Sequence, residues 1–179
     1  WVCKRDSFCR TFMIYVLFGP PGVGKTYIGG LLEKSLGMRF FDADVLFDDE
    51  MKKLVRSGNF STEKRDIFFE RLRVTTESLL TGLRNGQDLV LAQAFTKEKN
   101  RVNFSNAFDN QIKYVLVHAP KTLAHSRMVK RLLADPHIID EGAFEYAWRE
   151  FEDPRIEHVD LINDDLDNEK IVVAFEKFK

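Results

Sequence analysis

The chain has 179 residues, in which 27 basic side chains nearly balance 28 acidic ones, for a formal net charge of −1. The length fits one domain over residues 1–179, and a 44% hydrophobic content excludes a disordered chain. The near-neutral charge predicts no nucleic-acid partner, and the longest apolar run, residues 12–18, is far shorter than the roughly 20 residues of a membrane helix. Because no secretory signal is visible and the two cysteines, Cys3 and Cys9, have no disulfide or metal spacing, we expect a cytoplasmic protein.

Short apolar runs alternate with longer stretches of helical periodicity along the chain. Residues 12–18 are continuously apolar and end in glycine and proline, which predicts a buried strand. Apolar side chains then recur at helical spacing over residues 28–36, and Gly37 ends this helix. Further strands are predicted at 38–41, 88–92, 112–118 and 158–162, and further helices at 44–56, 62–84, 121–133, 141–151 and 167–178. Five strands separated by helices predict an α/β fold, a parallel sheet covered on both faces.

A phosphate-binding motif follows the first predicted strand. Residues 19–26 read GPPGVGKT, which satisfies G-x-x-x-x-G-K-[ST] between a strand and a helix. Backbone N–H groups of such a loop cradle phosphate, the lysine reaches the β- and γ-phosphates, and the threonine hydroxyl faces Mg²⁺. The alternative is a glycine-rich turn that only connects strand and helix. We therefore predict ATP and Mg²⁺ as cofactors, with the nucleotide bound by Gly19, Pro20, Pro21, Gly22, Val23, Gly24, Lys25 and Thr26.

Two aspartates follow the second predicted strand. Asp42 and Asp44 are two residues apart at its carboxyl end, where ligands bind in open α/β sheets. The third strand ends in Leu91-Ala92-Gln93-Ala94 and supplies no Walker B aspartate, so Asp42 is predicted to hold Mg²⁺ together with Thr26. Asp44 is then predicted to face the acceptor hydroxyl. The alternative is that Asp44 only caps the next helix.

Several basic side chains are candidates for contacts with phosphate or with an anionic acceptor. Arg127 and Arg131 are four residues apart on one predicted helix face and lead into residues 132–142, where proline and glycine interrupt the pattern. This segment is predicted to be a lid that closes over the phosphates. Arg65, at the start of the long helix, is a candidate for bidentate contact with an anionic acceptor. The alternative for Arg127 and Arg131 is a solvated helix face. The adjacent Phe68 and Phe69 are interpreted as core residues.

From residue 12 onward the chain resembles the small P-loop kinases of the gluconokinase and shikimate kinase group. GPPGVGKT is followed about fifteen residues later by FFDAD, similar to the D-x-D motif of both families. Residues 57–65 (SGNFSTEKR) resemble the gluconokinase stretch that ends in a substrate-facing arginine, and residues 94–101 resemble the segment after the third strand. Residues 127–131 (RMVKR) lie where these kinases carry lid arginines.

The resemblance implies a three-layer P-loop kinase fold with a five-stranded parallel sheet and a lid. It implies catalytic roles for Lys25, Asp44, Arg127 and Arg131, and acceptor contacts for Asp44, Arg65, Gln93 and Lys97. Residues 160–166 (DLINDDL) resemble a nucleoside monophosphate kinase loop whose asparagine, here Asn163, contacts the ATP base.

The chain also departs from both families. Phe47 replaces the histidine of gluconokinases, while Gln93-Ala94 and Glu70 replace a glycine-rich turn and an arginine of shikimate kinases. Shikimate is therefore disfavoured as the acceptor.

These observations together predict an ATP-dependent phosphotransferase. It would transfer the γ-phosphate to an alcohol group of a small molecule, for example a sugar acid such as gluconate. The alternatives are a nucleotide or nucleoside kinase and a non-catalytic NTP-binding regulatory module. The expected partners are ATP and the acceptor, without nucleic acid or membrane, and a homodimer is left open.

Overall fold

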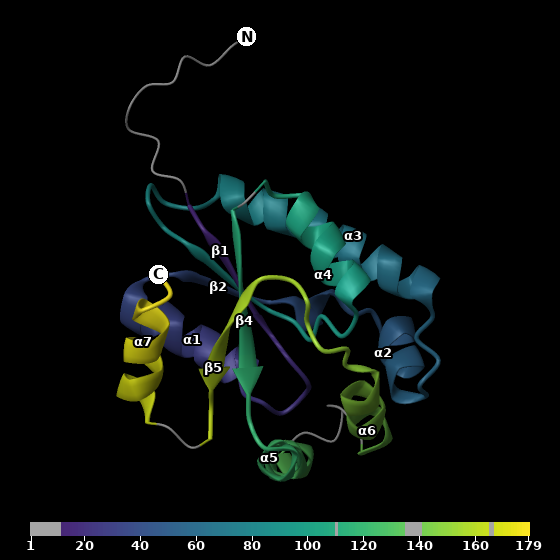
Figure 1. Cartoon of the computed structure of the whole chain (residues 1–179). Coiled ribbons are helices and arrows are strands. Elements are labelled where there is room, and N and C mark those ends of the chain that lie inside the picture. The colour runs from purple at the N-terminus through teal and green to yellow at the C-terminus, as the bar shows by residue number, and fades with distance from the viewer. Residues whose placement is uncertain (1–11, 110, 135–140, 165–166) are drawn as a thin grey trace.

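A five-stranded, wholly parallel sheet forms the centre of the protein (Figure 1). The computed structural model describes residues 12–109, 111–134, 141–164 and 167–179. The strands are β1 (Ile14–Phe18), β2 (Arg39–Asp42), β3 (Leu89–Ala92), β4 (Ile112–His118) and β5 (His158–Ile162), in the order β2-β3-β1-β4-β5. The predicted α/β fold with a parallel sheet is confirmed.

Helices cover both faces of the sheet and the end at which its strands finish. They are α1 (Lys25–Leu36), the 3-10 turn η1 (Ala43–Leu46), α2 (Asp49–Arg56), α3 (Thr62–Thr81), α4 (Glu98–Asn106), α5 (Lys121–Ala134), α6 (Glu141–Glu150) and α7 (Asn168–Glu176). Figure 1 shows α1 and α7 on one face, α3 and α4 on the other, and α5 and α6 toward the carboxyl ends of the strands. Within the described residues, every helix is too short or too polar to cross a membrane.

Strand β1 is buried on both sides, which explains its unbroken apolar sequence. Tyr15 and Leu17 pack in a core with residues of α1 and α7, including Ile28 and Phe175. Alternate residues of the same strand, such as Val16, pack in a second core with residues of α3 and α4. The central strand therefore anchors the phosphate loop that follows it between two hydrophobic cores.

The structure corrects one predicted helix and adds one that was not predicted. The predicted helix over 44–56 consists of η1 and α2, because the Asp48 carboxylate accepts a hydrogen bond from the Met51 N–H (2.8 Å) and starts a new helix. Helix α4 was not predicted, because its sequence, EKNRVNFSN, has few apolar residues and buries Asn100 and Arg101 instead. The predicted lid over 132–142 lies mostly outside the described residues, since 135–140 fall between α5 and α6.

Candidate active site

The phosphate loop leads directly into the amino-terminal end of α1. Gly24 precedes this helix with a left-handed backbone (φ 103°), and neither a side-chain cap nor an acidic residue occupies the first turn. A Cβ atom on Gly24 would collide with the Asn163 side chain, and one on Gly22 would collide with the backbone of Ala124. The loop therefore needs glycine at both positions, and its helix end keeps N–H groups and a partial positive charge for an anion.

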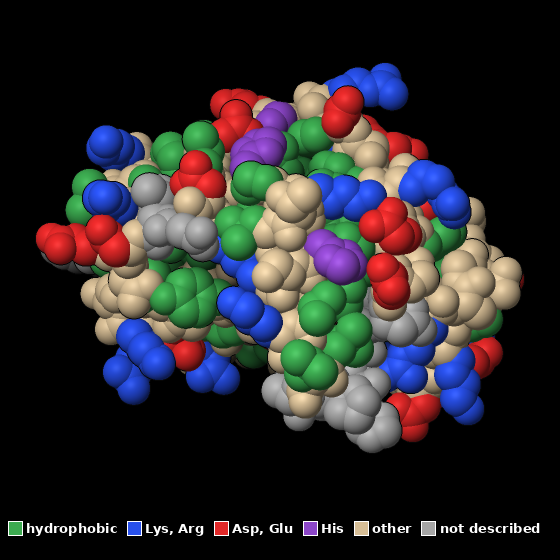
Figure 2. Space-filling model, turned by 90° about the horizontal axis from the view of Figure 1, so that it is seen from below, with side chains coloured by type: hydrophobic (Ala, Val, Ile, Leu, Met, Phe, Trp, Pro, Cys, Tyr) green, Lys and Arg blue, Asp and Glu red, His purple; other side chains and the backbone are tan. Residues whose placement is uncertain are grey.

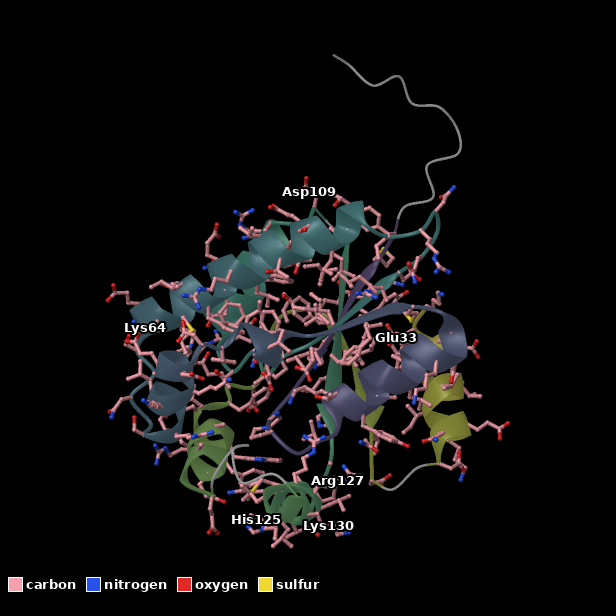
Figure 3. The ribbon with its side chains drawn as sticks, turned by 180° about the vertical axis from the view of Figure 1, so that it is seen from behind. Glu33, Lys64, Asp109, His125, Arg127 and Lys130 are labelled. Atoms are coloured by element: carbon pink, nitrogen blue, oxygen red, sulfur yellow. The ribbon has the colours of Figure 1, made fainter. Side chains whose placement is uncertain are left out.

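Side chains from α5, from α6 and from the segment after β5 hold the outer side of this loop by hydrogen bonds to its carbonyl groups. The Asn163 amide donates to the Val23 carbonyl oxygen (2.8 Å), and the Arg127 guanidinium donates to the carbonyl oxygens of Val23 (3.4 Å) and Asn163 (3.2 Å). The Trp148 indole donates to the Pro21 carbonyl oxygen (3.1 Å). Figure 3 shows Arg127 on the side of α5 nearer the sheet, and Lys130 on its outer side. Asn163 and Arg127, predicted to contact nucleotide, thus both support the loop.

Lys25, Thr26 and Asp42 lie together at the inner side of the loop. The Lys25 ammonium donates to the carbonyl oxygens of Gly19 (2.8 Å) and Pro20 (2.7 Å). Burial lowers the pKa of Lys25 to about 8, although Asp44 and Asp42 oppose this shift. The Thr26 hydroxyl donates to Asp42 Oδ2 (2.8 Å).

Thr26 and Asp42 also suit the predicted magnesium ion. A hydroxyl and a carboxylate oxygen side by side are the kind of ligand that Mg²⁺ takes, with water and phosphate oxygens completing its shell. No group of three or more His, Cys, Asp or Glu side chains among the described residues could hold a metal by itself. The donor set therefore fits a cation that enters with a nucleotide.

Asp44 occupies the first turn of η1, beside Asp42. It is not the cap of this turn, because Asp42 Oδ1 accepts the hydrogen bond from the Asp44 N–H (3.0 Å). The Asp44 carboxylate accepts a hydrogen bond from the Gln93 amide (3.2 Å) and keeps an exposed edge. Loss of hydration inside the protein and the neighbouring Asp42 raise the pKa of Asp44 to about 6, against the opposing effects of Lys25 and Gln93.

These groups line one cavity of about 560 Å³. Of the predicted residues, its wall includes Pro21, Gly22, Gly24, Lys25, Thr26, Asp42, Asp44, Arg65, Gln93 and Arg131. Lys97, predicted to contact the acceptor, is not part of this wall: its ammonium pairs with Glu150 (3.1 Å), which lines the cavity, and with Glu152 (3.3 Å). Figure 2 views the molecule from the side of α5 and α6, where basic, acidic and hydrophobic side chains lie interspersed.

Sequence reasoning missed the aromatic half of this cavity. Its wall also contains Phe47, Phe60, Phe68, Phe69 and Phe95, with Lys52, Val55, Arg56, Met128, Tyr146 and Glu150. Phe68 does belong to the core, as predicted, and is 1% exposed. The missed signal was the number of phenylalanines near the D-x-D motif, which contact one another only after folding.

The parallel sheet, the phosphate loop and the adjoining aspartates give the chain the architecture of a P-loop kinase, similar to that of gluconokinases and shikimate kinases. Residues 14–154 match the family model of an AAA domain, and the chain belongs to this family. A probable gluconokinase of Dictyostelium discoideum is 28% identical over 142 residues, which cover 76% of this chain and 71% of that protein.

Solved structures confirm the predicted fold. A gluconokinase from Sinorhizobium meliloti 1021 has a TM-score of 0.70 over 92% of this chain and 89% of its own, at 20% identity. A sugar kinase from Janibacter sp. HTCC2649 has a TM-score of 0.76 over 93% of each chain, at 17% identity.

Proposed function

We propose that the protein transfers the γ-phosphate of ATP to an alcohol group of a small molecule bound in the cavity. The observation that carries this proposal is the position of Asp44, whose carboxylate lies in the same cavity wall as Lys25 and Thr26 of the phosphate loop. One cavity can therefore hold a nucleotide and an acceptor side by side, as phosphoryl transfer requires.

Each step of the proposed transfer can be assigned to a group in the cavity wall. The Asp44 carboxylate takes the proton of the acceptor hydroxyl, while a bond forms from that oxygen to the γ-phosphorus and the bond to ADP breaks. A carboxylate with a pKa of about 6 is ionised and still basic near neutral pH. Lys25 and Arg131 offset the charge of the phosphates. Mg²⁺, held by Thr26 and Asp42, would supply further charge neutralisation.

Two acceptor types are supported by different observations. Arg65 lies in the cavity wall and suits the carboxylate of a sugar acid, and the Dictyostelium relative carries the name gluconokinase. The phenylalanines of the wall instead favour an acceptor with a flat ring, such as a nucleoside.

The proposal is tested by ADP release from MgATP in the presence of gluconate, other sugar acids, polyols or nucleosides. At least one acceptor should stimulate ADP release, and Lys25→Ala should lower the rate by about 10²–10³, the usual cost of one preorganised charge. Lys34→Ala, an exposed lysine of the same helix, is the matched control and should leave the rate unchanged. Nucleotide binding without acceptor-stimulated turnover would instead support the regulatory module.

A further inference from the structure

Five phenylalanine rings along the cavity contact one another in a continuous series. The ring centroids of Phe60 and Phe47 are 5.8 Å apart, and Phe47 stacks on Phe68 at 4.3 Å. The series continues from Phe68 to Phe69 at 5.3 Å and from Phe69 to Phe95 at 4.8 Å. All five residues line the cavity, so we call this set the aromatic wall.

The aromatic wall begins at the segments that hold the proposed general base. The Phe47 N–H donates to the Asp44 carbonyl oxygen (3.2 Å), so both residues belong to one short turn. Phe95 is two residues beyond Gln93, whose amide donates to the Asp44 carboxylate. An acceptor whose hydroxyl group contacts Asp44 therefore has phenyl rings next to the rest of the molecule.

The wall is only partly covered by protein. Phe68 and Phe95 are each 1% exposed and belong to the core, whereas Phe47, Phe60 and Phe69 remain partly exposed. Apolar ring surface that protein atoms leave uncovered gains free energy when a ligand removes it from water, and an aromatic ligand gains further from edge and face contacts.

A polyhydroxylated acceptor matches this surface poorly. Each hydroxyl buried without a hydrogen-bond partner carries a free-energy penalty, and phenyl rings supply no such partner. Polar side chains lie near the phosphate loop, at Lys25, Thr26, Asp42, Asp44 and Gln93, and elsewhere in the wall, at Lys52, Arg56, Tyr146 and Glu150. The mismatch with a polyhydroxylated acceptor therefore applies to the part of the cavity that the phenyl rings line. On the far side, the Arg65 guanidinium lies 5.8 Å from the centroid of the Phe60 ring, where it can stack with a planar group.

We infer that the acceptor is an alcohol with an aromatic body, which packs against Phe47, Phe60 and Phe69 while its hydroxyl group meets Asp44. This inference rests on the proposed function and narrows its acceptor from small alcohols in general to ring-bearing ones. A polyhydroxylated sugar acid is the class that it excludes as the preferred acceptor.

The test compares kcat/KM for ADP release with gluconate against adenosine, thymidine and benzyl alcohol, with cyclohexylmethanol as a non-aromatic match for the last. At least one aromatic alcohol should exceed gluconate tenfold or more, and benzyl alcohol should exceed cyclohexylmethanol. Phe60→Leu should raise KM for the preferred aromatic alcohol about tenfold and leave KM for ATP unchanged. Phe178→Leu, a partly buried phenylalanine of the other core, is the matched control and should change neither constant.

Thermal unfolding of both variants checks that each is folded. A preference for gluconate, or an unchanged KM for every aromatic alcohol in folded Phe60→Leu, overturns the inference while the proposed kinase activity stands. Absence of ADP release with every acceptor overturns the proposed function itself, and the inference with it.

Discussion

Asp44 and Lys25 share one end of the cavity, and their surroundings move their pKa values toward each other. Loss of hydration raises the pKa of the carboxyl group to about 6 and lowers that of the ammonium group to about 8. Their mutual attraction opposes both shifts. Between these two values the Asp44 carboxyl group is ionised and Lys25 keeps its positive charge, so both groups have the charge that the proposed phosphoryl transfer needs.

The substitution Asp44→Asn separates the effect of this carboxylate on catalysis from its effect on the free energy of unfolding. Removing a general base should lower kcat by about 10²–10⁴, with little change in ATP affinity. Because the pKa of Asp44 is raised on folding, the native state binds more protons than the unfolded state between about pH 4 and pH 6, and stability falls as pH rises through this window. The variant should therefore be more stable than wild type at pH 7, by roughly 1 kcal/mol after allowance for solvent at its exposed edge.

Urea unfolding at pH 7 and pH 4, beside steady-state kinetics, measures both effects. The stability difference should shrink at pH 4, where Asp44 is protonated in wild type. Asp42→Asn is the control and should chiefly change the Mg²⁺ dependence. Near-normal turnover of Asp44→Asn would remove the general-base role.

Helix α5 connects the phosphate loop with the cavity. The backbone of Ala124 lies against Gly22, Arg127 holds the carbonyl groups of Val23 and Asn163, and Arg131 lines the cavity one turn further on. The two arginines, predicted as an equivalent pair, therefore have different surroundings. Arg127 contacts the loop through its carbonyl groups, and Arg131 lines the cavity, where we propose that it contacts phosphate.

Arg131→Lys tests the role of the second arginine. A planar guanidinium can hold two phosphate oxygens at once, whereas lysine offers a point charge, so kcat should fall at least tenfold with a smaller change in KM for ATP. Lys130→Arg, an exposed position on the outer side of the same helix, is the control and should leave both constants unchanged. A normal kcat for Arg131→Lys would place this arginine outside the transition state.

Arg101 joins segments that are distant in sequence on one side of the sheet. Its fully buried guanidinium donates to the carbonyl oxygens of Phe95 (2.8 Å) and Glu152 (2.6 Å) and pairs with Glu98 (2.7 Å). It also lies over the rings of Phe18 and Phe151. Arg101 thus holds the loop after β3, which supplies Phe95 to the cavity, against the segment after α6.

Arg101→Ala should lower the free energy of unfolding by about 3–5 kcal/mol, since it leaves buried carbonyl groups and the Glu98 carboxylate without their partner. Urea unfolding measures the change. Arg84→Ala, which removes an exposed arginine, should change stability by less than about 0.5 kcal/mol. A similarly small effect at Arg101 would contradict its role as the joint between these segments.

The elements that the sequence predicts well are those with a local signal. The strand at 112–118 and the break near Gly58 follow from apolar periodicity and turn residues, and GPPGVGKT carries its own backbone requirements in its glycines. The proximity of Thr26 and Asp42 could also be predicted from the sequence, because parallel strands end at one edge of the sheet. Helix α4 was not predicted, because its buried face contains the polar residues Asn100 and Arg101 in place of an apolar stripe.

Sequence patterns therefore sufficed for the parallel α/β fold, the phosphate loop and the nearby carboxylates, because each depends on residues close together in the chain. Folding was needed to see that Lys97 pairs with Glu150, that Asn163 contacts the loop, and that Phe60 and Phe95 lie in one wall. These side-chain contacts depend on distances between residues that are far apart in sequence. Periodicity reports which face of an element is buried, but it does not report which atoms meet there.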